Sequence, residues 1–376
     1  MKFVTHSTQS AGNLARRESG GLTTFEPDVR VAVVGYGYWG SKHIRVLSSM
    51  PGVQVTIVDS DPERIAEARR TYPTAESAEG LDDVLSRVDA VVVATPPTAH
   101  APVALRALRQ GRHVLVEKPL ATTVEDAEEM VDAAAASGVH LMAGHTFEYN
   151  AAVWKLKEII DSGELGRILY IDAARLSLGK YQCDCNVIWD LAPHDISIAS
   201  YLLGEVPRTA SVWANRHVGH RHADVAYLRL DFESAATHAF VHVSWLDPCK
   251  VRRVTVVGER KMAVYNDMSD NERVRIYDIG VDPTDPDSES HAMPVSYRTG
   301  DIVSPYIQFN EPLLVQDSHF ISCIRTGATP NTSGERGLDI VRVLAATDVA
   351  EATGRPAFVA ARIDRAGADR VRGVAS

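Results

Sequence analysis

The sequence is poor in cysteine, has no excess of basic residues and contains no long apolar run. Its four cysteines among 376 residues include Cys183 and Cys185, which have no second pair at zinc-site spacing; we expect reduced thiols and no metal. Acidic residues outnumber basic ones by 49 to 39, which argues against a nucleic-acid or anionic-membrane partner. Without a membrane-length apolar stretch or a signal peptide, the chain is expected to be cytoplasmic.

What the chain does have is a large hydrophobic content, 45% of its residues, which is enough for the cores of two domains. Residues 1–28 are polar and are expected to form a flexible leader, and residues 364–376 a similar tail. Between them we expect one domain over residues 29–147 and a second over residues 148–363, because the pattern of apolar segments changes there.

The first domain alternates short apolar segments with amphipathic ones, which predicts parallel strands joined by helices. The expected strands are Val29–Val34, Val53–Val58, Val88–Ala94, His113–Val116 and Val139–Ala143. The expected helices are Tyr38–Met50, Pro62–Arg70 with Asp61 as its N-cap, Ala99–Arg109 and Val124–Ala136. The fold class is therefore α/β, beginning with a doubly wound Rossmann sheet.

The second domain is predicted to be α+β, with a large and mostly antiparallel sheet that leaves one face open. A helix is expected at 151–161, strands at 168–176, 208–215, 225–232, 237–244, 251–257 and 261–265, and closing helices at 312–325 and 334–351. Residues 280–301, rich in Asp, Pro and Ser, are expected to form a surface loop. An open apolar face predicts a homodimer or homotetramer joined through the sheet.

A dinucleotide site is indicated at the first turn. Gly35, Gly37 and Gly40 fit G-x-G-x-x-G directly after a strand, with Tyr38 and Trp39 opening the next helix. The glycines let the backbone approach a pyrophosphate, and the helix N-terminus attracts negative charge. Asp59 ends the second strand and would accept hydrogen bonds from both ribose hydroxyls while repelling a 2′-phosphate. NAD is therefore favoured over NADP, although Arg64 follows in the next helix.

Three further segments carry chemistry: Ala94–His100, Val116–Pro119 with its Glu-Lys-Pro sequence, and Trp189–Asp195. Together with the glycine turn they make the chain resemble the glucose-fructose oxidoreductase / inositol dehydrogenase / rhizopine catabolism (Gfo/Idh/MocA) family over about residues 29–351. The resemblance implies an oxidoreductase acting on CH–OH groups. It adds five residues to the expected cofactor site, namely Thr95, Pro96, His100, Glu117 and Lys118.

The expected catalytic residues are Lys118, Asp190 and His194. Lys118 follows the C-terminal end of a strand, where doubly wound sheets hold their ligands. Pro193 predicts the first turn of a helix, with Asp190 near its N-cap and His194 just inside. The resemblance makes Lys118 a contact of the reacting hydroxyl, His194 the acid/base and Asp190 an orienting or substrate residue. Either Lys118 or His194 would take the hydroxyl proton while a hydride passes to nicotinamide.

The sugar-like substrate is less defined. Asn186-Val187-Ile188 stands where many members have a glycine-rich stretch, whereas Arg175 to Gly179 matches the Arg-x-x-Leu-Gly of nucleotide-sugar and amino-sugar 3-dehydrogenases. Reaction at a pyranose C3 is therefore favoured. The expected substrate pocket comprises His145, Tyr149, Asn150, Arg175, Tyr181 and Asn186, with Asp190 and His194.

Three alternatives stay open. An inositol, other cyclitol or free-sugar dehydrogenase would carry the same motifs. A non-catalytic NAD-binding regulator has the same fold but no need for a proton-handling set. An enzyme that recycles tightly bound NAD with a second sugar would copurify with its cofactor.

Overall fold

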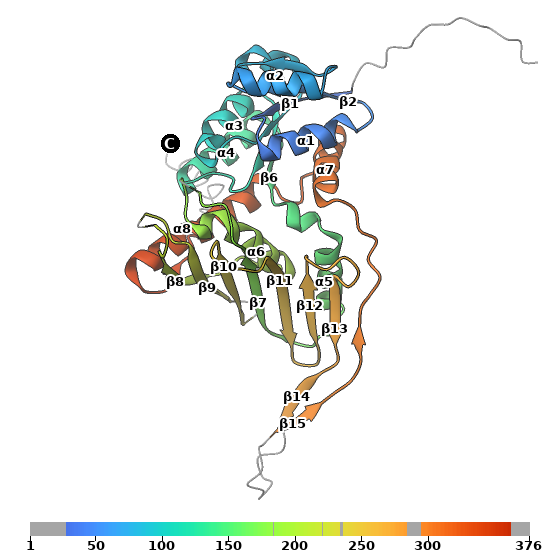
Figure 1. The fold of residues 1–376 in the computed structure, drawn as a ribbon, viewed down its shortest axis with the longest axis vertical. Helices are drawn as coiled ribbons and strands as arrows, with labels where there is room; N and C mark the ends of the chain where they lie inside the picture. Colours follow the sequence, from blue (N-terminus) through green and yellow to red (C-terminus); the bar gives the residue numbers. More distant parts are fainter. Residues whose placement is uncertain (1–27, 183, 220, 234–235, 284–294, 362–376) are drawn as a thin grey trace, which may run out of the picture.

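The structure, a computed structural model, describes residues 28–361 except 183, 220, 234–235 and 284–294. The predicted tail, and the predicted leader apart from Asp28, lie outside the described residues. The chain forms a Rossmann domain, drawn at the top of Figure 1, and a second domain built on a broad sheet below it.

The Rossmann sheet has six parallel strands in the order β3-β2-β1-β4-β5-β6. They are β1 (Val29–Val34), β2 (Val53–Val58), β3 (Glu76–Ala78), β4 (Ala90–Val93), β5 (His113–Glu117) and β6 (Leu141–Gly144). The helices are α1 (Tyr38–Ser48), α2 (Pro62–Thr71), α3 (His100–Arg109) and α4 (Val124–Ser137), with short 3₁₀ turns η1 (Leu81–Asp83), η2 (Leu85–Arg87), η3 (Pro97–Ala99) and η4 (Thr146–Tyr149).

Local sequence signals account for most of these boundaries. The strands β1 and β4 are almost wholly buried because helices cover both faces of the sheet. Asp61 caps α2 as predicted, its carboxylate accepting from the Glu63 amide at 2.9 Å. Thr123 does the same for α4 through the Asp126 amide. The short edge strand β3 was not predicted.

The second sheet has nine strands in the order β16-β13-β12-β11-β7-β10-β9-β8-β17. Only β7 and β10 pair in parallel, so the predicted, mostly antiparallel sheet is confirmed. Its strands are β7 (Ile168–Leu176), β8 (Thr209–Asn215), β9 (Val225–Phe232), β10 (Thr237–Ser244), β11 (Val251–Gly258), β12 (Met262–Asn266), β13 (Val274–Tyr277), β16 (Ile302–Val303) and β17 (Ala357–Phe358).

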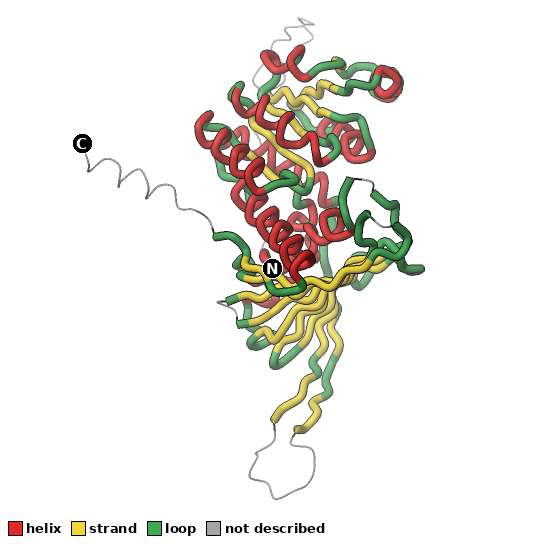
Figure 2. The backbone as a smooth tube through the Cα atoms, turned by 90° about the vertical axis from the view of Figure 1, so that its left-hand side faces the viewer, coloured by secondary structure: helices red, strands yellow, loops and turns green. Residues whose placement is uncertain are grey.

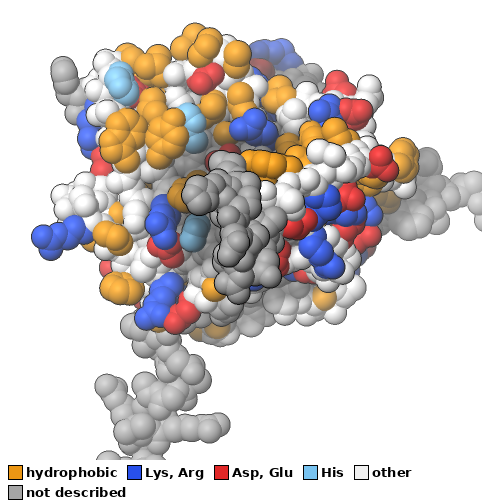
Figure 3. Space-filling model, turned by 90° about the horizontal axis from the view of Figure 1, so that it is seen from below, with side chains coloured by type: hydrophobic (Ala, Val, Ile, Leu, Met, Phe, Trp, Pro, Cys, Tyr) orange, Lys and Arg blue, Asp and Glu red, His pale blue; other side chains and the backbone are white. Residues whose placement is uncertain are grey.

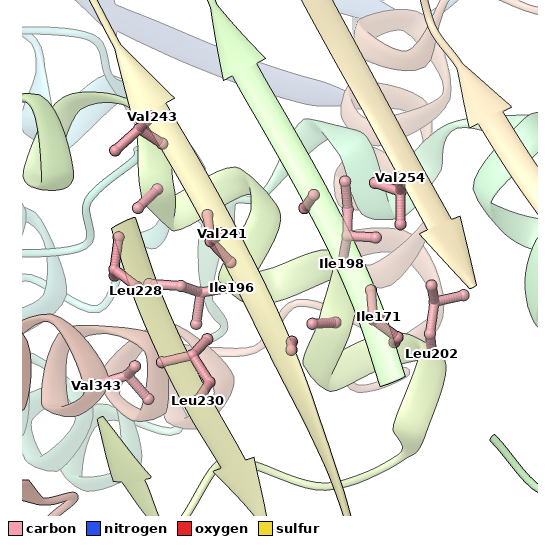
Figure 4. Close-up of a cluster of buried hydrophobic side chains, with 14 of the residues drawn as sticks. Ile171, Ile196, Ile198, Leu202, Leu228, Leu230, Val241, Val243, Val254 and Val343 are labelled. Atoms are coloured by element: carbon pink, nitrogen blue, oxygen red, sulfur yellow. The ribbon is translucent and has the colours of Figure 1, made fainter. Parts of the chain in front are cut away.

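One face of this sheet is covered by helices, as Figure 2 shows. They are α5 (Ala151–Asp161), α6 (Val187–Leu203) and α8 (Gly334–Thr353). Figure 4 shows α6 side chains such as Ile196 and Leu202 packed on Leu228, Val241 and neighbouring strand residues. This core fixes α6, and therefore every polar residue on α6, relative to the sheet.

The other face of the sheet is open, and aromatic side chains gather on it (Figure 3). Trp213 is 55% exposed and Tyr227 49% exposed. The Tyr227 ring stacks on His242 with centroids 4.0 Å apart, and Tyr170 contacts Phe240 edge to face. These rings form an ordered apolar surface on the side of the sheet away from the helices.

The closing helices return to the Rossmann domain. The helix α7 (Pro312–Thr326) packs on α1, and α8 packs on α4 and β6 as well as on β8. The connection between them is tied to β6 by the Ala143 amide, which donates to the Thr332 carbonyl at 2.7 Å. The two domains are thus joined by helices as well as by the chain near residue 147.

The expectation of an irregular surface loop over residues 280–301 is wrong in part. The strands β14 (Gly280–Pro283) and β15 (Val295–Arg298) pair as an antiparallel ribbon that projects from the sheet (Figure 1). Backbone pairing outweighs the poor strand propensity of this segment, and Arg298 reinforces it through Asp282 at 3.0 Å. Within the described residues, no helix is both long and apolar enough to cross a membrane.

Candidate active site

The glycine turn between β1 and α1 has the tight geometry that its motif predicts. Gly35 adopts a positive φ of 97°, a conformation that favours glycine. A Cβ on Gly40 would lie 1.7 Å from the Gly35 carbonyl oxygen, so only glycine allows the helix this close to the strand. A Cβ on Gly37 would meet no heavy atom within 4 Å. The space beside Gly37 is therefore open to a ligand at the start of α1.

Asp59, at the end of β2, is buried and fixed by the backbone. Its Oδ2 accepts from the Tyr36 amide at 2.6 Å and its Oδ1 from the Asp61 amide at 2.9 Å. The Arg64 guanidinium lies 3.7 Å from Oδ2. The arrangement places a carboxylate at the expected ribose position, with one half-exposed cation beside it.

A cavity of about 430 Å³ lies between the glycine turn, the C-terminal ends of β4 and β5, and the start of α6. Of the predicted site residues, its wall includes Trp39, Thr95, His100, Glu117, Lys118, Asn186 and Asp190. The hydroxyl oxygen of Thr95 is buried without a hydrogen-bond partner, an orphaned polar atom that a bound ligand would satisfy. The open space at Gly37 and this orphaned hydroxyl both fit a dinucleotide.

Lys118 and Asp190 meet across this cavity, although 72 residues separate them. The Lys118 ammonium donates to the backbone carbonyl of Asp190 at 2.6 Å and to the side-chain Oδ1 of Asp190 at 3.2 Å. The second carboxylate oxygen accepts from the Trp245 indole at 2.9 Å. Trp245 is buried in the sheet core, so it fixes the carboxylate that faces Lys118. The Lys118–Pro119 peptide bond is cis.

The helix that carries Asp190 begins earlier than its proline suggests. The prediction placed Pro193 in the first turn; in the structure α6 begins at Val187, and Pro193 lies inside it. Asn186 is the N-cap, its side chain accepting from the Trp189 amide at 3.0 Å. Pro193 removes only one helical hydrogen bond, and packing of α6 on the sheet outweighs that loss.

His194 follows Asp190 by one helical turn and is partly buried against Phe147, with ring centroids 4.9 Å apart. Its Nδ1 is buried and has no hydrogen-bond partner. Burial, followed by the positive charges of Arg175 and Lys118, holds the pKa of His194 well below its usual value. The imidazole is therefore neutral near pH 7.

His145 is a second neutral imidazole at the end of β6. Both of its ring nitrogens are buried without partners. Burial, with the charges of Arg336 and Lys118, lowers the pKa of His145 to about 3. Lys118 thus lies close enough to influence both histidines, although neither imidazole forms part of the cavity wall.

Three other predicted substrate residues have partners inside the protein. The Tyr149 hydroxyl bonds Thr332 Oγ1 at 3.1 Å, and the Asn150 amide donates to the Tyr265 hydroxyl at 2.9 Å while its oxygen caps α5. Arg175 makes a buried bidentate ion pair with Asp195 at 2.7 and 3.0 Å. None of these three lies on the cavity wall.

The remaining predicted residues, Tyr181, Tyr38 and Pro96, are not part of the cavity wall. Tyr181 packs on Trp245, with centroids 5.2 Å apart, and is half exposed. Tyr38 is 73% exposed and lies outside the cavity wall. Pro96 precedes η3 in the same turn as Thr95.

Glu117 and His100, both expected to bind the cofactor, belong to the cavity wall but make hydrogen bonds to other parts of the protein. His100 lies between the Pro119 carbonyl at 2.8 Å and the Thr95 carbonyl at 3.0 Å. Glu117 Oε1 contacts His43 Nε2 at 3.0 Å, and its Oε2 accepts from the Lys118 amide at 3.3 Å. These contacts hold the turns that carry Thr95 and Lys118.

His43, on α1, lies between two carboxylates in the interior. Its Nδ1 contacts the Asp317 oxygens at 2.9 and 3.1 Å, and its Nε2 contacts Glu117. Burial disfavours the charged imidazole, but the charges and hydrogen bonds of Asp317 and Glu117 outweigh it and raise the pKa of His43 to about 10. We call these three residues the buried triad; it joins α1, β5 and α7.

Sequence reasoning missed several residues of the site. Trp245, His43 and Asp317 gave no local signal, since their partners are 55 to 274 residues away. The cavity wall also includes Gln182, Asp184, Trp189, His222 and Asp348. The first two belong to the polar run that ends at Asn186, and this run was a usable signal.

Comparisons with known proteins agree with this arrangement. The model of the oxidoreductase family with an NAD-binding Rossmann fold matches residues 29–145, and that of the GFO/IDH/MocA C-terminal domain matches residues 153–264. The chain therefore belongs to the Gfo/Idh/MocA family, and its cofactor is NAD. The predicted family, fold class, oxidoreductase class and cofactor are confirmed.

Individual relatives are more distant. Inositol 2-dehydrogenase 2 of Saccharopolyspora erythraea is 34% identical over 51% of this chain and 58% of its own length. A structure from Magnetospirillum magnetotacticum described as an oxidoreductase is 30% identical, covering 85% of this chain and 99% of that one, with a TM-score of 0.71. A UDP-N-acetylglucosamine 3-dehydrogenase of Acidithiobacillus ferrooxidans is 24% identical, covering 86% and 97%, with a TM-score of 0.71. The chain spans 60% of the length of a Streptococcus pneumoniae oxidoreductase that is 30% identical.

The glycine turn gives a paired prediction. Gly40→Ala should destabilise the fold by roughly 1–3 kcal/mol or more, because its methyl group would collide with the Gly35 carbonyl. Gly37→Ala should leave thermal unfolding nearly unchanged but weaken NAD binding, because its methyl group enters open space at the start of α1. Calorimetry for stability and fluorescence titration for NAD test both; equal melting temperatures for the two variants would contradict the prediction.

The buried triad predicts a pH dependence of stability. In the folded protein His43 keeps its proton up to about pH 10, whereas an unfolded histidine loses it near 6.5. The contribution is therefore fully present below pH 6.5 and falls as the pH rises toward 10, by up to about 1.4 kcal/mol per pH unit. Urea unfolding between pH 6.5 and 9.5 should show this slope in the native chain and a shallower one in His43→Gln. Parallel profiles for the two proteins would rule it out.

Proposed function

We propose that the chain transfers a hydride between NAD and a secondary hydroxyl or ketone of a sugar-like substrate. The observation that carries the proposal is the Lys118–Asp190 contact at 3.2 Å, on the wall of a cavity that reaches the glycine turn. It brings an ammonium and an orienting carboxylate to the sheet edge where doubly wound folds hold nicotinamide. A neutral imidazole follows on the same helix.

The charge states of Lys118, Asp190 and His194 suggest a role for each side chain. When bound, NAD accepts or supplies the hydride. In the oxidative direction either Lys118 or His194 takes the hydroxyl proton. Lys118 lies on the cavity wall, whereas the neutral His194 lies one helical turn beyond Asp190 and outside the wall. A Lys118 ammonium would also stabilise the negative charge that develops on oxygen. Asp190 holds the ammonium in place and is itself held by Trp245. Reduction of a ketone runs the same proton path backwards.

The substrate is proposed to be a pyranose that reacts at C3. Support comes from the Arg175–Gly179 pattern and from the activity named for the Acidithiobacillus relative. Gln182, Asp184 and His222 on the cavity wall offer the donors and acceptors that sugar hydroxyls require. The inositol dehydrogenase of Saccharopolyspora gives a cyclitol as the second candidate. The set of Lys118, Asp190 and His194 favours an enzyme over a regulator.

Removal of the proton-handling side chains tests the activity. Lys118→Ala and His194→Ala should each lower turnover roughly 10²- to 10⁴-fold while NAD still binds. Nicotinamide absorbance would be followed in both directions with nucleotide sugars, amino sugars, free sugars and cyclitols. Lys155→Ala, which removes a surface ion pair with Glu158 on α5, is the matched control. Near-native turnover in both site variants would end the assignment.

We also propose that the chain forms a homodimer or homotetramer through the open face of the nine-stranded sheet. The rings of Tyr170, Trp213, Tyr227 and Phe240 are exposed there, and association removes such a surface from water.

A charge placed on this face tests the oligomer. Trp213→Glu should shift the sedimentation velocity of the protein toward that of a monomer, because a carboxylate in an apolar interface is costly. Val349→Glu, at a similarly exposed position on α8, should leave sedimentation unchanged. A native chain that sediments as a 41.0 kDa monomer would exclude the interface.

A further inference from the structure

The net charge of the buried triad can be deduced from its contacts. Each ring nitrogen of His43 faces a carboxylate, so the two contacts need two protons. Two protons shared among one imidazole and two carboxylates leave a net charge of −1, wherever each proton resides. A third proton has no place, because Glu117 Oε2 accepts from the Lys118 amide and both Asp317 oxygens face His43.

Among the described residues, His43 is the cation that forms an ion pair with Glu117 and with Asp317. His43 and Asp317 have no exposed surface, and Glu117 is 5% exposed. The further contacts of the triad are amides, from Gln316 to Asp317 and from Lys118 to Glu117. Of the nearest cations along the chain, Lys118 pairs with Asp190, and the Lys42 ammonium lies over the Tyr38 ring at 4.6 Å. Arg45 pairs with Glu311 and interacts with Asp317 only through space. A buried charge of this kind is weakly screened and acts at a distance.

The charge acts on the cofactor site because Glu117 belongs to the cavity wall beside Lys118. Oxidised nicotinamide carries a positive charge, and reduced nicotinamide is neutral. We propose that the Glu117–His43–Asp317 triad is an electrostatic device that favours binding of NAD⁺ over NADH. Glu117 and Asp317 are then positioning residues that set the reduction potential of the bound cofactor. The inference rests on the proposed function, which places the nicotinamide end of NAD next to Lys118.

The test compares the affinities of the two cofactor forms, which requires no substrate. Asp317→Asn and Glu117→Gln each replace a carboxylate by an amide of the same shape, and the triad becomes neutral when the amide oxygen accepts from a His43 that keeps both protons. Each should change the ratio of the NADH and NAD⁺ dissociation constants by about tenfold in favour of NADH, as expected for one unit charge removed from a partly buried site. Glu311→Gln makes the same change at the half-exposed N-cap of α7 and should leave the ratio unaltered.

Fluorescence titration of the full chain with NAD⁺ and with NADH gives both constants. Binding of both forms with an unchanged ratio in the two triad variants overturns the inference and leaves the proposed function intact. Failure of the native chain to bind either form overturns the proposed function instead. If both variants fail to fold, the ratio of the two dissociation constants in the native chain is the test. Binding of NADH more than tenfold tighter than that of NAD⁺ would contradict an anionic triad.

Discussion

The contact between Lys118 and Asp190 is the constraint on which the site depends. Lys118 directly follows strand β5 of the Rossmann domain, and Asp190 lies on α6, which packs on the sheet of the second domain. Neither domain alone positions both groups. The 2.6 Å bond to the Asp190 carbonyl and the 3.2 Å contact with its carboxylate therefore require the two domains to be docked. The returning helices α7 and α8 hold that docking from the other end of the chain.

The same residues serve the fold and the site. Glu117 was expected at the cofactor, yet its oxygens are occupied by His43 and by the Lys118 amide. Its effect on a bound ligand is therefore one of charge and placement rather than of direct hydrogen bonding. Arg175 is similar: it pairs with Asp195 inside the domain, and its charge still lowers the pKa of His194. A buried ion pair is poor evidence for added stability, but the pair with Asp195 holds the Arg175 charge at a fixed position near His194.

What the sequence predicts well is local. The strand at Val29–Val34, the cap at Asp61 and the glycine turn follow from periodicity and backbone sterics that act over a few residues. The start of α6 was misjudged because Pro193 is a strong local signal, whereas packing on the sheet decides where the helix lies. The β14–β15 ribbon was missed for the same reason, since its pairing outweighs its composition.

Side-chain partners distant in sequence are a different matter. Tyr149 and Asn150 were assigned to the pocket together with His145. Neighbouring residues in a turn point in different directions, however, and these two reach Thr332 and Tyr265. His43 meets Asp317 across 274 residues. No periodicity encodes such a meeting; it arises only when α7 returns to pack on α1.

The placement of the site also limits how the protein can assemble. The cavity lies at the start of α6. This helix is on the covered face of the second sheet (Figure 2), whereas the aromatic surface lies on the opposite face (Figure 3). A partner bound to that surface would therefore leave the cavity open to NAD and substrate.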